Sequence, residues 1–118
     1  MSLSATLQVI LNPLASGGAW RARAGQGVVA PYIVFTFAGS PNDNVIDGPP
    51  TAQNTRLQVD IYATTSAEAD SITAAVVAAM QAAADAKDFG CWSINSPRDE
   101  PDPDTRLFRV IAEFSIWT

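Results

Sequence analysis

Few side chains in this sequence could make or break a covalent bond. It contains no histidine and one cysteine, Cys91. Because histidine is the commonest general base and the usual partner of a cysteine nucleophile, Cys91 has no histidine to activate it. Its place in an alternating segment predicts instead a small apolar side chain, buried on a strand. A single cysteine also excludes an internal disulfide.

Residues 25–30, GQGVVA, have the Gly-x-Gly-x-x-Ala spacing of a dinucleotide-binding fingerprint. That chemistry needs a helix directly after the glycines, whose free N–H groups hold a pyrophosphate. Here Pro31 and a run of strand-forming residues follow. We therefore expect a turn and no bound cofactor.

Four carboxylates crowd residues 97–104, PRDEPDPD: Asp99, Glu100, Asp102 and Asp104. Clustered carboxylates can bind calcium, but a calcium loop also needs a glycine bend and a distal bidentate acid. Neither is present, and Pro101 and Pro103 stiffen the segment. The pattern predicts a solvated hairpin turn and no metal site.

Arg21 and Arg23 alternate with apolar residues in AWRARA, residues 19–24, and no acid occurs in residues 1–42. This places both arginines on one face of a short strand. Two interpretations stay open. The arginines could protect an exposed edge from strand-to-strand aggregation. Alternatively, this basic edge with Trp20 could pair with the acidic turn of another subunit.

The elements that position these residues follow from hydrophobic periodicity. Alternation predicts strands at residues 19–24, 31–39, 56–63, 89–96 and 105–118. In the third of these, Leu57, Val59 and Ile61 face one way while Arg56, Gln58, Asp60 and Tyr62 face the other. Arg109 and Glu113 share the second face of the last strand. A pocket on that face would need Asp60, Tyr62, Arg109 and Glu113 to converge.

Two segments have helical spacing. Residues 3–12 form the first, which ends before Pro13 because proline cannot continue a helix. Thr65 and Glu68 are spaced as a capping box that opens the second, which runs to about residue 86. Its buried stripe comprises Ala69, Ile72, Val76, Met80 and Ala83. The order predicts one α+β domain, residues 1–118: a twisted, mostly antiparallel sheet of about five strands with both helices on its apolar face.

Residues 39–53 contain three prolines and two glycines and show no usable period. A loop of this length inside a small domain is usually functional. It carries Val45 and Ile46 with no evident packing partner, so these two residues are candidates for burial against another protein.

Composition narrows the function classes. The net charge of −5 disfavours nucleic-acid binding, because phosphate backbones repel a chain of that sign. The longest apolar run, ITAAVVAAM, is far shorter than the roughly 20 residues of a membrane span, and the start lacks the basic residues of a signal peptide. We expect a soluble, cytoplasmic protein.

RLQVDIYATTSAEADSITAAVVAAM, residues 56–80, resembles the small tail-completion proteins of phage and prophage tail gene clusters, including the tail-terminator type. Matching pieces are PYIVF at residues 31–35, RLQVDIYA at 56–63, AEAD at 67–70 and the long final strand at 106–117. The resemblance implies an α+β platform, no enzymatic activity and a structural role in virion assembly.

The resemblance further implies capping of a tail tube, as a homo-oligomeric ring that contacts tail-tube and head-completion proteins. Such a protein would assemble in the cytoplasm of the bacterial host and remain in the virion tail. The alternative is a small-molecule-binding or enzymatic domain with a pocket under residues 39–53.

Overall fold

The computed structural model describes residues 3–37, 54–86, 89–100 and 106–117. Its elements follow in the order α1 (Leu3–Leu11), a 3₁₀ turn (Asn12–Leu14), β1 (Ala19–Arg21), β2 (Tyr32–Phe37), β3 (Asn54–Ala63), α2 (Ser66–Asp85), β4 (Gly90–Asp99) and β5 (Phe108–Trp117). This confirms the predicted α+β fold. Residues 39–53, with Val45 and Ile46, lie outside the described residues, as do Asp102 and Asp104.

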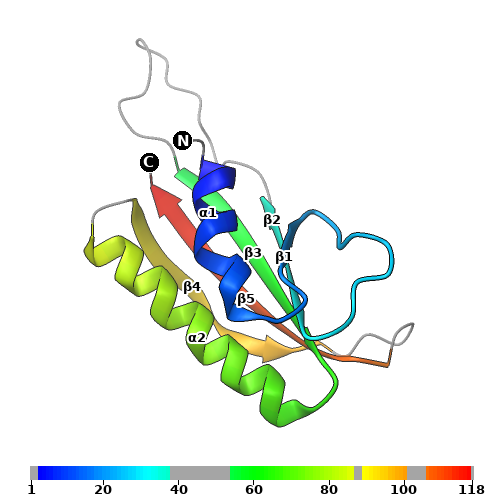
Figure 1. Ribbon diagram of the computed structural model, residues 1–118. Helices are drawn as coiled ribbons and strands as arrows, with labels where there is room; N and C mark the ends of the chain where they lie inside the picture. Colours follow the sequence, from blue (N-terminus) through cyan, green and yellow to red (C-terminus); the bar gives the residue numbers. More distant parts are fainter. Residues whose placement is uncertain (1–2, 38–53, 87–88, 101–105, 118) are drawn as a thin grey trace, which may run out of the picture.

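The strands form one sheet in the order β1-β2-β3-β5-β4. β1 pairs with β2 in parallel, and the other neighbours are antiparallel, as the sequence predicted. β3 lies at the centre and pairs with β5 over its full length. The two edges of the sheet are therefore β1 and β4, which are far apart across the molecule (Figure 1).

Both helices lie on the same side of the sheet (Figure 1). They cover the face that carries Leu57, Val59 and Ile61, and none of these three side chains is exposed to solvent. The predicted inner stripe of α2 is buried there together with Leu7 and Leu11 of α1. Burial of each large apolar side chain contributes about 1.5–3 kcal/mol, so this layer holds most of the stability of the fold.

The capping box at the start of α2 is present, with one difference. The Thr65 hydroxyl accepts a hydrogen bond from the Glu68 N–H at 3.1 Å, as expected for the N-cap. The Glu68 carboxylate accepts from the N–H of Thr64, one residue before the cap. The box still satisfies donors that the first helical turn leaves without an internal partner.

The predicted ends of the strands β1 and β4 are wrong. β1 ends at Arg21, because Ala22 has a φ of 70°, outside the range of a strand. β4 continues past Pro97 to Asp99, where a turn was predicted. Pro97 is tolerated because β4 is an edge strand, and an edge strand has a side on which no N–H is needed.

Candidate functional site

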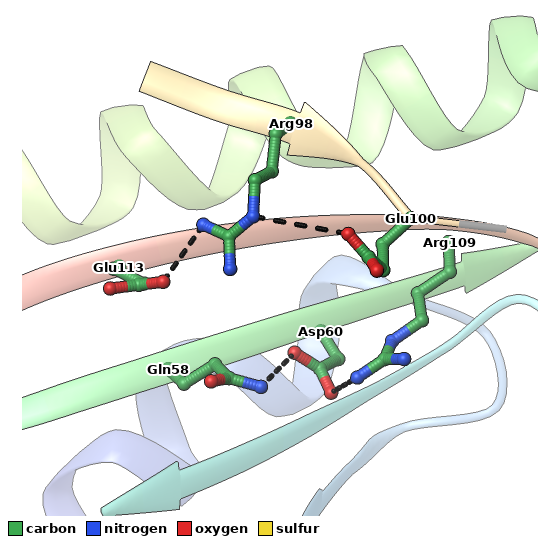
Figure 2. Close-up of polar contacts among 6 residues, drawn as sticks. All are labelled: Gln58, Asp60, Arg98, Glu100, Arg109 and Glu113. Carbon is green, nitrogen blue, oxygen red and sulfur yellow. Dashed lines mark hydrogen bonds and ion pairs between the residues drawn. The ribbon is translucent and has the colours of Figure 1, made fainter. Parts of the chain in front are cut away.

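The helix-free face of the sheet carries a buried carboxylate, Asp60 on β3, which is only 5% exposed. Arg109 on β5 donates from Nη2 to one carboxylate oxygen at 2.8 Å, and Gln58 donates to the other at 3.0 Å. Figure 2 shows the three side chains converging across the two strands. The charge of Asp60 is thereby neutralised inside the face, as a buried charge requires.

A second ion pair joins β4 to β5 on the same face. Arg98 donates from Nη1 to Glu113 at 2.8 Å, and its Nε lies 4.0 Å from a carboxylate oxygen of Glu100 (Figure 2). The Arg98 side chain is 46% exposed, so the pair contributes about 0–1 kcal/mol.

A hollow of about 320 Å³ lies on this face where the loop after β1 meets the sheet. Three of the four residues predicted for a pocket line it: Asp60, Tyr62 and Arg109. Glu113 is absent from its lining and pairs with Arg98 instead. The rings of Tyr32 and Tyr62 stack with centroids 4.8 Å apart and form a flat wall.

At the opposite end of the helix-free face, two tryptophans form an exposed pair. Trp92 on β4 is 61% exposed and Trp117 on β5 is 42% exposed, and their rings meet edge to face with centroids 6.4 Å apart. Gly90 leaves the space they occupy, since a Cβ there would lie 3.2 Å from the Cβ of Trp117. Large exposed aromatic side chains are typical of protein interfaces. The sequence prediction missed both, although alternation places Trp117 on this face.

The basic edge is arranged differently from the prediction. Arg21 pairs in register with Phe35 and lies over the ring of Phe37 at 4.8 Å, at the margin of the helix-covered face. Arg23 lines the hollow on the helix-free face. The positive φ of Ala22 turns the chain between them, so the prediction that both arginines share one face is wrong. Both remain exposed.

The loop that follows β1, residues 22–31, is held closely against the sheet. The Trp20 ring packs on Gly25, where any side chain would come within 2.9 Å of it, and the indole N–H donates to the Gly17 carbonyl. The Val28 N–H bonds to the Gly25 carbonyl, and Gly27 supplies the positive φ of the turn. The GQGVVA segment is thus a turn that leads into β2, as predicted. Val29 projects from it, 76% exposed.

Asp99 and Glu100 do not form the tip of a turn. Asp99 is the last residue of β4 and pairs with Val110, while the Glu100 N–H bonds to the Arg109 carbonyl at 2.8 Å and continues the ladder. Because neighbouring strand residues point to opposite faces, Asp99 faces α2 and Glu100 faces Arg98. The predicted acidic cluster is therefore divided between the two faces, at least as far as the described residues show.

Between α2 and the outer half of β4 runs a groove of about 630 Å³. Its walls are mainly apolar, with Ala74, Val77 and Ala78 on the helix and Pro97 on the strand. Asp70 and Asp99 also line it, and its described lining includes no basic residue. Beside this groove, the pairing of β4 with β5 shifts register twice between Ser93 and Arg98.

Cys91 is a half-buried residue on β4 that packs against the core, in line with its predicted position on a strand. Burial raises the pKa of its thiol to about 11, so the thiol stays protonated at neutral pH. Among the described residues, no three histidine, cysteine or acidic side chains are grouped closely enough to hold a metal ion. No described helix has the length and apolarity of a membrane span.

The fold and its described surfaces define an α+β domain with exposed aromatic, apolar and charged side chains on its edges, its helices and one sheet face. The chain matches the family described as tail completion protein gp17 over residues 5–118, and it belongs to that phage tail-completion family. The family name assigns a structural role in the phage tail. A comparison with curated proteins gave no match.

Proposed function

We propose that this protein completes the phage tail as a non-catalytic component, by forming a ring of identical subunits on the end of the tail tube and offering a face to the head-completion proteins. The observation that carries the proposal is the opposite charge of the two edges of the sheet. The β1 side carries Arg21 and Arg23 and no acid in residues 3–37, whereas the β4 side carries Asp70 and Asp99 in one groove. Arg98 on β4 is paired with Glu113 and Glu100 on the other face of the sheet.

Opposite edges of this kind suit a head-to-tail contact, in which one patch of a subunit meets a different patch of the next. Such a contact closes into a ring when the rotation between neighbours is right. Val45, Ile46, Asp102 and Asp104 stay predicted contact residues in this assembly. Assembly in the host cytoplasm is part of the same proposal.

The polar residues on the helix-free face support a structural role. Asp60 is engaged by Arg109 and Gln58, and Arg98 is engaged by Glu113. Both oxygens of Asp60 and one oxygen of Glu113 accept hydrogen bonds from neighbouring side chains, and such bonds favour the ionised form and hold the carboxylates in place. We infer that the hollow beside Tyr62 is part of a contact surface and that the protein turns over no substrate.

The test measures assembly of the pure protein, alone and with its tail-tube protein, by sedimentation velocity and negative-stain electron microscopy. We expect closed rings of one subunit number. Reversal of either charge, in Arg21→Glu or in Arg23→Glu, should weaken the rings, while Arg56→Glu, an exposed arginine on the central strand β3, serves as the charge-matched control. Monomers under all conditions, or turnover of a metabolite by the pure protein, would contradict the proposal.

A further inference from the structure

The charges at the two edges cannot hold subunits together by themselves. Exposed ion pairs contribute about 0–1 kcal/mol each, so apolar burial must supply most of the affinity between copies. The apolar partner surfaces should therefore lie beside the charges. On the basic side the most exposed large apolar side chain of the described residues is Val29, and on the acidic side the apolar feature is the groove between α2 and β4.

Neither edge is suited to direct strand pairing between copies. β1 has three residues and ends where Ala22 adopts a positive φ. β4 is long, but two register shifts between Ser93 and Arg98 interrupt its regular pleat. Short or bulged edges of this kind oppose addition of a further strand. A contact between copies through these edges must therefore use side chains and not a shared backbone ladder.

We propose that the groove between α2 and β4 receives the residue 22–31 loop of a second copy, with Val29 between Val77 and Pro97. This inference rests on the proposed ring and names the surfaces through which its subunits meet. The groove is lined mainly by apolar atoms and would take a small branched side chain without displacing a buried group.

Charge complementarity favours the residue 22–31 loop of a second copy as the occupant of the groove. The groove presents Asp70 and Asp99, while the loop that carries Val29 also carries Arg23 and lies next to Arg21. Arg23, which belongs to the same loop as Val29, would approach a carboxylate as Val29 entered the apolar part. Opposite charges at the rim of an apolar contact speed association and fix its register.

The loop is also organised before any contact. Packing of Trp20 on Gly25, the turn at Gly27 and the bond from the Gly17 N–H to the Pro31 carbonyl at 2.8 Å hold it in one conformation. A loop that is already ordered loses little conformational entropy on docking. Val29 is 76% exposed, so it contributes little apolar burial to the isolated domain. Docking into the groove would bury it.

Disulfide trapping tests the proposal directly. Two variants are made in a Cys91→Ser background: Val29→Cys, in the loop, and Ala78→Cys, in the groove. The matched control is Ala82→Cys, an exposed alanine of α2 that does not line the groove. Each variant is first compared with the wild-type protein by circular dichroism and sedimentation.

A mixture of the Val29→Cys and Ala78→Cys proteins should form disulfide-linked dimers in at least about tenfold higher yield than the mixture with Ala82→Cys, because docking raises the effective thiol concentration. Neither variant alone should form them, since the contact joins two different surfaces. Rings of wild-type protein without this selective cross-link, or cross-linking of Val29→Cys with itself, would overturn the groove contact and leave the ring proposal standing. Absence of any wild-type assembly, alone or with tail-tube protein, would overturn both.

Discussion

The two faces of the sheet use the same strands for different purposes. On the helix-covered face, Leu57, Val59 and Ile61 of β3 are fully buried. The residues that alternate with them along β3, Gln58 and Asp60, are polar and lie on the helix-free face. The first face has its partners within the chain. The second holds together by ion pairs, stacked tyrosines and the buried Val34 and Ile111, and it leaves tryptophans exposed at one end. The difference indicates that most of the stability comes from the helix-covered side, and we propose that the other side and the edges contact other proteins.

The largest expected effect on stability comes from the helix-covered face. Phe114→Ala should lower the free energy of unfolding by about 3–5 kcal/mol, because it leaves a cavity in a core where Phe114 is 2% exposed. Trp92→Ala, on the other face, should lower it by less than about 1 kcal/mol, as a mostly exposed side chain loses little burial. Urea unfolding followed by circular dichroism measures both. Equal losses would remove the distinction between the faces.

Asp60 is the exception on the helix-free face, because it is a buried charge. Asp60→Ala should cost about 2–3 kcal/mol, since it leaves Arg109 partly buried without its carboxylate. The double variant Asp60→Leu, Arg109→Met should recover much of that loss. Thermal unfolding of the two variants checks this. A double variant no more stable than Asp60→Ala would mean that the pair itself, and not the orphaned charge, determines the stability.

A smaller effect is expected at the N-cap of α2, directly after β3. Thr65→Ala removes the acceptor for the Glu68 N–H and should destabilise the protein by about 1 kcal/mol. Thr65→Ser keeps the hydroxyl and should remain within a few tenths of a kcal/mol of the wild type. Chemical denaturation of the three proteins would show this, and equal losses in both variants would argue against the cap.

The last prediction concerns Cys91, whose neighbour on β4 is the exposed Trp92. Cys91 lies against the core while Trp92 is exposed on the other face. With a thiol pKa of about 11 instead of 9.0, Cys91 should react with iodoacetamide at pH 8 roughly 100-fold more slowly than the unfolded chain, in proportion to its thiolate. Because the folded pKa is the higher one, stability should fall as pH rises from about 9 to 11. Mass spectrometry follows the alkylation. Equal rates for the folded and the unfolded protein would show that the Cys91 thiol is fully accessible to solvent.

The sequence predicted those parts of the fold that have a strong period. The alternation from Leu57 to Tyr62 and the stripe from Ala69 to Ala83 each specify one buried face, so the sheet, the second helix and their contact followed. The boundaries at Ala22 and Pro97 did not follow, because a positive φ at an alanine and a proline on an edge strand depend on tertiary neighbours.

The surfaces were less predictable than the fold. Alternation placed Asp60, Tyr62 and Arg109 on one face, but their mutual pairing depends on the register between β3 and β5. The groove between α2 and β4 lies beside register shifts that no local sequence pattern predicts. Arg21 and Arg23 were correctly singled out as exposed charges near an edge, and their separation onto two faces required the backbone geometry of Ala22.

We propose that the protein acts as a permanent structural component of the phage particle, through contacts with other proteins. The most direct test titrates pure protein into phage tails made without it and counts head-joined particles by electron microscopy. We expect the count to rise in proportion to added protein, to reach a plateau at a fixed number of subunits per tail, and the protein to be found in every completed particle. Completion of many tails by far fewer protein molecules, with none retained in the product, would contradict the claim.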